Sequence, residues 1–207
     1  MNNNLSVKSP RRKVSRLSVV VLVMSAWAMQ LSPLTIASDF FEFKGDALQR
    51  PTGYREWVFV GTPVTPNDMN DGKAAFPEFH NVYIDPISWG VWKDKGEFPQ
   101  DTILIKELVD VGTKAASSGN GYFQGNYIGL EAVIKSAERF ADEPGNWAYF
   151  SFSSEAGKSL KTQATPFPTE SCNACHQVAA DDDYVFTQHY PVLRVGKGAG
   201  EDATGGM

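Results

Sequence analysis

The first 38 residues contain no acidic side chain, and their apolar run is short. A basic segment precedes roughly 15 mostly apolar residues at 17–31, and small side chains follow as far as Ala37. The basic residues are Lys8, Arg11, Arg12, Lys13 and Arg16. The apolar run is shorter than the ~20 residues that span a bilayer, and this order is typical of a cleaved signal peptide. We expect residues 1–37 to be removed on export, leaving no membrane anchor.

Basic residues are scarce in the rest of the chain. Five of the 19 lysines and arginines but none of the 24 acidic residues precede residue 38, which leaves 14 basic against 24 acidic residues. This acidic balance disfavours nucleic acid as a partner; it suits a basic electron-transfer protein and equally serves solubility. The sequence has no internal repeat, and its length fits one core. We predict a single domain at 38–195 and a disordered glycine-rich tail at 196–207.

Cysteine is scarcer still, and both cysteines lie in the pentapeptide Cys172-Asn173-Ala174-Cys175-His176. This is the spacing of c-type haem attachment, in which each thiol adds to a vinyl group and the adjoining histidine ligates the iron. The alternatives are a redox disulfide, half of a zinc site, and coincidence. Export favours haem, because this attachment takes place in the periplasm. We predict one covalently bound haem c on Cys172 and Cys175, with His176 as the proximal iron ligand, in a periplasmic protein.

Methionine, the sixth iron ligand of many small cytochromes, is nearly absent from the mature chain. Only Met69 and the terminal Met207 follow residue 37, and Met69 lies in a turn-rich segment that is typical of a surface loop. The haem motif also lies near the carboxyl end, whereas the first class of small cytochromes carries it near the amino end. The sequence therefore predicts a five-coordinate iron with a position open to chemistry or gas binding.

Helical periodicity is rare, which argues against the four-helix cytochromes c′. Asp85-Pro86 and Gly96 predict a helix from residue 86 to about 95, and a second short helix is expected to carry the haem motif. Turn-rich loops are expected at 62–73 and before Gly121, and 184–195 closes the domain. Strands are expected at 56–60, 81–84, 102–111, within 122–136 and at 147–152. We predict an α+β fold with a mainly antiparallel β-sheet and haem attached near the carboxyl end.

One lysine interrupts an apolar strand. In the segment 103–109, strand alternation places Lys106 on one face with Leu104 and Leu108, while Ile103 and Ile105 point to the other face. Such a lysine lies at a sheet edge, extends its ammonium into water, or faces a pocket. The residues alone leave these alternatives open.

Segments across nearly the whole mature domain resemble the cytochrome P-460 family. They are Tyr54-Arg55-Glu56-Trp57-Val58, Val64-Thr65-Pro66-Asn67, Asn70-Asp71-Gly72-Lys73-Ala74, Val82-Tyr83-Ile84-Asp85-Pro86, Gly96-Glu97-Phe98, Lys106-Glu107-Leu108, 119–148, Val185-Phe186-Thr187 and Tyr190-Pro191-Val192-Leu193-Arg194. The family consists of periplasmic mono-haem enzymes that oxidise hydroxylamine, form homodimers of a mainly β fold, and carry a lysine cross-linked to the haem edge. The resemblance places this lysine at Lys106.

The resemblance implies oxidation of hydroxylamine to nitrous oxide or nitrite at a five-coordinate, lysine-cross-linked haem. Hydroxylamine would bind the iron opposite His176, with nitric oxide as a related ligand, and a soluble periplasmic cytochrome would accept the electrons. Removal of protons requires an acceptor, and His80 and His189 are the remaining histidines. Each could equally be a surface or structural histidine; His80 is the candidate distal proton acceptor.

The chain also departs from the family pattern at two positions. His80 stands where we expect an arginine, and Phe167 leaves no carboxylate just before Pro168, which puts the proton route in doubt. Two other functions stay open. One is a non-enzymatic nitric-oxide-binding protein that is cytochrome c′-beta-like and lacks the cross-linking lysine; the other is an electron-transfer cytochrome, for which His80 could be the sixth ligand. Lys106 favours the enzyme.

Overall fold

The computed structural model describes Met1 and residues 39–154 and 159–200. The chain divides into two units, residues 1–36 and 37–207, and the second unit holds the fold described below. Apart from Met1, the predicted leader at 1–37 lies outside the described residues, as does 201–207. Among the helices of the described part of the chain, none is long and apolar enough to cross a membrane.

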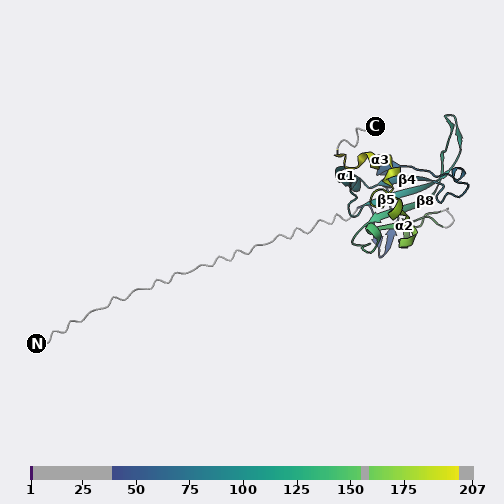
Figure 1. The fold of residues 1–207 in the computed structure, drawn as a ribbon. Coiled ribbons are helices and arrows are strands. Elements are labelled where there is room, and N and C mark those ends of the chain that lie inside the picture. Colours follow the sequence, from purple (N-terminus) through teal and green to yellow (C-terminus); the bar gives the residue numbers. More distant parts are fainter. Residues whose placement is uncertain (2–38, 155–158, 201–207) are drawn as a thin grey trace. The chain divides into compact units, whose positions relative to one another are not determined.

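A five-stranded antiparallel sheet forms the centre of the domain (Figure 1). Its order is β3 (Val58–Gly61), β4 (Phe79–Ile84), β5 (Ile103–Val111), β8 (Gln124–Lys135) and β9 (Trp147–Ser151). A three-stranded sheet contains β1 (Phe43–Lys44), β2 (Ala47–Gln49) and β10 (Gln163–Ala164), and a small hairpin contains β6 (Ala115–Ala116) and β7 (Gly119–Asn120). The α+β class with mainly antiparallel pairing is confirmed.

Local signals set the helix boundaries. Helix α1 (Pro86–Lys95) has the predicted bounds, because the Asp85 carboxylate accepts the Ser88 N–H at 2.8 Å and Gly96 ends the helix in the left-handed region at φ 71°. The haem motif lies on α2 (Thr169–Ala179), and α3 (Pro191–Gly196) closes the domain. Short 3₁₀ helices η1, η2, η3 and η4 occupy Tyr54–Glu56, Asn67–Met69, Pro144–Asn146 and Thr187–His189.

Three details differ from the sequence-based expectations. The strand expected from residue 56 begins at Val58, because η1 follows Gly53 at φ 73° and includes residue 56. The loop before Gly121 contains the β6–β7 hairpin, which projects from the sheet in teal at the upper right of Figure 1. The expected tail at 196–207 begins too early, since Gly196 belongs to α3 and the Gly198 N–H donates to the Trp92 carbonyl at 3.1 Å.

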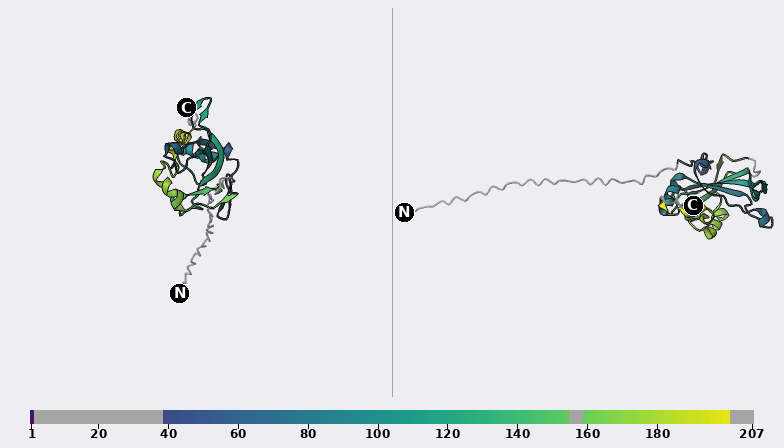
Figure 2. Two further views of the ribbon diagram at one scale, coloured as in Figure 1. Left: turned by 90° about the vertical axis from the view of Figure 1, so that its right-hand side faces the viewer. Right: turned by 90° about the horizontal axis from the view of Figure 1, so that it is seen from above.

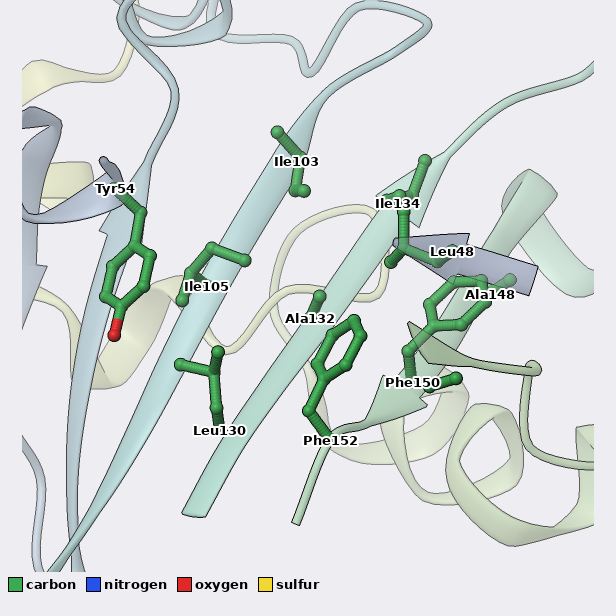
Figure 3. Close-up of a cluster of buried hydrophobic side chains, with 11 residues drawn as sticks. Leu48, Tyr54, Ile103, Ile105, Leu130, Ala132, Ile134, Ala148, Phe150 and Phe152 are labelled. Atoms are coloured by element: carbon green, nitrogen blue, oxygen red, sulfur yellow. The ribbon is translucent and has the colours of Figure 1, made fainter. Parts of the chain in front are cut away.

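The two faces of the sheet bury separate cores. Figure 3 shows the first, in which Ile103 and Ile105 of β5 lie beside Leu130, Ala132 and Ile134 of β8. The second core lies on the other face and includes Val82, Leu104, Trp92, Trp147 and Leu193. Figure 2 shows the long strands curving, with α2 (yellow-green) on one side of them. Consecutive residues of β5 therefore belong to different cores.

Candidate functional site

A pocket of about 390 Å³ lies between the sheet and α2 on the face of the second core. Its walls are mostly apolar, which suits a large planar ligand. They include Phe76, Val82, Leu104, Ala132, Val133, Tyr149, Phe150, Phe167, Val185, Phe186 and Tyr190. The polar lining is sparse, so the few ionisable side chains that reach the pocket determine its chemistry.

Helix α2 brings both cysteines and the histidine of the motif to this pocket. Cys172, Cys175 and His176 all line it, because residues three and four apart share one face of a helix. Between the cysteines, the buried Asn173 side chain donates to the Trp147 carbonyl at 2.8 Å and ties α2 to β9. Both thiols are free, and burial raises the pKa of the Cys172 thiol. The helix thus presents two free thiols and an imidazole side by side.

The surroundings of His176 favour one tautomer. Its Nδ1 lies 2.7 Å from the Tyr184 carbonyl oxygen, and a carbonyl only accepts, so Nδ1 carries the proton and donates. The Nε2 lone pair is therefore left for a metal. Burial lowers the pKa of His176, which favours the neutral ring that ligation requires. The rings of Tyr149 and Phe186 lie 4.6 and 4.5 Å from the imidazole.

Lys106 reaches the same pocket from the sheet. Strand β5 lies between β4 and β8, so the sheet-edge interpretation is wrong. The Lys106 Nζ lies 2.5 Å from an Oε atom of Glu131, its direct partner across the β5–β8 ladder, and 5.4 Å from the centre of the Phe76 ring. About a quarter of each side chain in the pair is exposed. The amine therefore stands beside both the pocket and a carboxylate.

His80 also lines this pocket, whereas His189 and Met69 do not. The His80 Nε2 is buried, has no hydrogen-bond partner among the described residues, and lies 3.5 Å from a Glu78 carboxylate oxygen. Burial alone would raise the pKa of Glu78, but the His80 contact and the Lys106 charge lower it. His189 is exposed and stacks on Phe186, and Met69 is 73% exposed.

Sequence reasoning missed Glu131 and Glu78. Glu131 faces Lys106 only through the register of two strands, and the long-range pairing of 106 with 131 is not visible in either strand alone. Glu78 lies two residues before His80 but outside β4, which begins at Phe79, so the alternation of that strand does not reveal its contact with His80. Phe167, at the second departure from the family pattern, lines the pocket.

Two thiols and a neutral imidazole beside an apolar pocket fit a haem group and define a site of the cytochrome type. The Cytochrome P460 family model matches residues 51–187, more than half of the chain, and the chain belongs to this family. Membership implies a haem cofactor and associates the chain with haem oxidoreductases. A search of curated proteins found no match. The matched region includes the whole motif, Lys106 and His80.

Proposed function

We propose that this protein is a periplasmic enzyme that oxidises hydroxylamine to nitrous oxide or nitrite at one covalent, five-coordinate haem c cross-linked to Lys106. The observation that carries the proposal is the position of Lys106 in the pocket that Cys172, Cys175 and His176 line, although it lies 66 positions before the first cysteine. A lysine at the edge of a haem pocket, beside a carboxylate that can take its proton, is suited to forming a bond with the haem.

The chain's own residues have distinct roles in this proposal. Cys172 and Cys175 would hold the haem as thioethers, and His176 would ligate the iron through Nε2 while its Nδ1–H donates to the Tyr184 carbonyl. When bound, the haem supplies an iron that takes hydroxylamine through nitrogen and removes its electrons. The apolar walls exclude water from the bound substrate.

Two carboxylates and one histidine provide proton acceptors. Glu131 is within 2.5 Å of the Lys106 Nζ, so it can take a proton from the amine. Forming the cross-link would also remove a C–H hydrogen of the haem and two electrons, which an external two-electron oxidant such as a peroxide would accept. For substrate protons, His80 is the proposed distal acceptor, because its buried Nε2 has no hydrogen-bond partner among the described residues. Glu78, 3.5 Å from that nitrogen, would stabilise the imidazolium that results.

Spectroscopy together with mass measurement tests the cross-link. We expect the haem-loaded protein to show a red-shifted ferrous Soret band, and peptide mapping to find haem joined to the Lys106 peptide as well as to the motif. Lys106→Met should leave haem on the cysteines, restore an ordinary haem c spectrum and abolish hydroxylamine oxidation. Lys95→Met, which removes an exposed lysine of α1, serves as the control. It should leave both the spectrum and the rate of hydroxylamine oxidation unchanged. Turnover retained by Lys106→Met would refute the role of this lysine.

One observation favours a second candidate, a nitric-oxide-binding protein without turnover. Phe167 lines the pocket where the family pattern led us to expect a carboxylate, so the pocket has one proton acceptor fewer. An ordinary haem c spectrum in the unmodified protein, with a stable nitrosyl and no consumption of hydroxylamine, would establish this alternative.

Homodimer formation and transfer of electrons to a soluble periplasmic cytochrome complete the proposal. Sedimentation measures the first. Reduction of an added cytochrome c during hydroxylamine oxidation measures the second.

A further inference from the structure

The turn at 182–185 holds two consecutive non-glycine residues in the left-handed region. The Val185 N–H donates to the Asp182 carbonyl at 2.7 Å, and between them Asp183 and Tyr184 have φ 41° and 64°. Turns with two positive φ values ordinarily contain glycine, asparagine or aspartate, because a bulky side chain is strained there. Tyr184 therefore needs neighbours that hold this conformation, and such strain often accompanies functional sites.

The neighbours of this turn come from β8, β9 and the segment before β9. One Asp183 carboxylate oxygen accepts from the Lys135 Nζ at 2.6 Å, and the other accepts from the Trp147 indole N–H at 3.2 Å. Lys135 is itself fixed, since its Nζ also donates to the Phe98 carbonyl at 2.9 Å and only 15% of its side chain is exposed. Trp147 is fully buried. Both donors are thus rigid parts of the sheet.

The Tyr184 ring is confined as well. A Cβ atom added to Gly145 would lie 2.5 Å from this ring, so the backbone of η3 approaches it closely. With the ring and the preceding carboxylate both held, the peptide carbonyl of Tyr184 has a fixed direction. That carbonyl accepts from the His176 Nδ1 at 2.7 Å, and the Tyr149 hydroxyl is 3.4 Å from the same oxygen. The longer contact is the weaker of the two.

We propose that Asp183, held by Lys135 and Trp147, is a positioning residue that keeps the Tyr184 carbonyl on the proximal histidine. A strong acceptor at Nδ1 makes the imidazole a better electron donor through Nε2, which stabilises ferric iron. By holding this carbonyl in place, the Asp183–Lys135 pair lowers the reduction potential of the haem. This inference rests on the proposed ligation by His176 and is independent of the substrate.

Two variants test the inference in the haem-loaded protein. Asp183→Ala and Lys135→Met should each lower the iron–histidine stretching frequency of the ferrous protein, measured by resonance Raman spectroscopy. Each should also favour ferrous iron about tenfold, an upward shift of roughly 59 mV for one electron. Lys135→Arg, which retains the ion pair, should restore both values. Asp181→Ala removes an exposed carboxylate two residues away and serves as a charge-matched control with no expected change.

The outcomes separate the inference from the proposed function. If Asp183→Ala does not fold, Lys135→Met decides alone, because it leaves the turn sequence intact. An unchanged stretching frequency and potential in Lys135→Met would overturn the positioning role. A shift of equal size in Asp181→Ala would overturn it too, since bulk charge would then explain the effect. Absence of an iron–histidine band in the unmodified protein would refute the five-coordinate haem with His176 as its one axial ligand, on which this test rests.

Discussion

Replacing Tyr54 by phenylalanine should lower the free energy of unfolding by about 2 kcal/mol. The Tyr54 hydroxyl donates to a Glu107 carboxylate oxygen at 2.8 Å, and Glu107 is only 1% exposed. Burial, followed by this bond, raises the pKa of Tyr54, so the hydroxyl stays a donor across the ordinary pH range. Hydrogen bonds to charged groups contribute about 1.5–3 kcal/mol. The ring remains in the core, so packing is preserved and the hydroxyl accounts for the loss.

The rest of the cluster shows why this hydroxyl matters. Arg55 forms an ion pair with the same carboxylate, but 56% of its side chain is exposed and solvent screens the attraction. The other Glu107 oxygen, Oε2, is buried and has no hydrogen-bond partner among the described residues. Tyr54→Phe therefore leaves the buried Glu107 carboxylate with the largely exposed Arg55 as its ion-pair partner. A double-mutant cycle with Glu107→Gln should recover an interaction energy of about 2 kcal/mol.

Urea unfolding of the haem-loaded protein, followed by far-ultraviolet circular dichroism, measures the loss. With a slope of about 2 kcal/mol per molar, the midpoint should fall by about 1 M while the slope stays unchanged. Tyr127→Phe is the matched control, because Tyr127 is 61% exposed and should change stability by less than about 0.5 kcal/mol. A loss below about 0.5 kcal/mol in Tyr54→Phe would refute the reasoning.

Two further predictions concern carboxylates that contact β5 or the pocket. Asp85→Ala should cost about 2–4 kcal/mol in thermal unfolding, because this buried side chain accepts from the backbone N–H groups of both Ser88 and Ile103, at 2.8 and 3.1 Å. Glu78 has a folded-state pKa below the ordinary 4.5, so its contact with His80 stabilises the fold above pH 4.5 and loses this effect as pH falls through the folded pKa. The free energy of unfolding of Glu78→Gln should therefore fall less between pH 7 and pH 3 than that of the unmodified protein. Urea unfolding at a series of pH values measures this difference.

Exposed neighbours provide the controls for these two variants. Asp94→Ala on the exposed side of α1 should be nearly neutral, and an equal loss in both α1 variants would contradict the capping argument. Glu97→Gln, the exposed control for Glu78→Gln, should leave the decrease in the free energy of unfolding between pH 7 and pH 3 (the acid limb) unchanged. An unaltered acid limb in Glu78→Gln would show that the Glu78–His80 contact does not form in solution.

Local signals predicted much of the fold. The helix at 86–95 follows from an N-cap, a proline and a glycine within twelve residues, and the strand at 102–111 follows from an apolar segment long enough to cross the sheet. The motif helix was also predicted. Strand 56–60 was placed too early, because η1 satisfies local backbone hydrogen bonds that an alternating pattern does not reveal.

Non-local geometry explains what the sequence could not predict at the site. Lys106 was recognised as unusual, but its partner Glu131 follows from the register of β5 and β8, which contains irregularities after Leu108 and Val109. A bulge displaces every later pair, so no pattern within one strand fixes which side chains meet. The Asp183–Lys135 contact joins residues 48 positions apart and was likewise not predicted.

The two-sided burial of β5 has a consequence for the order of maturation. Lys106 faces the pocket, whereas the next residue, Glu107, is buried against Tyr54 on the opposite face, so the lysine reaches its place only when both cores have closed. The motif follows every described strand in the sequence, and in the proposed function haem would join it after export, before the chain folds. Attachment would then precede closure of the sheet, and the cross-link would come last. The cross-link would thus form only in a correctly folded chain, and a misfolded chain would carry haem without the lysine bond.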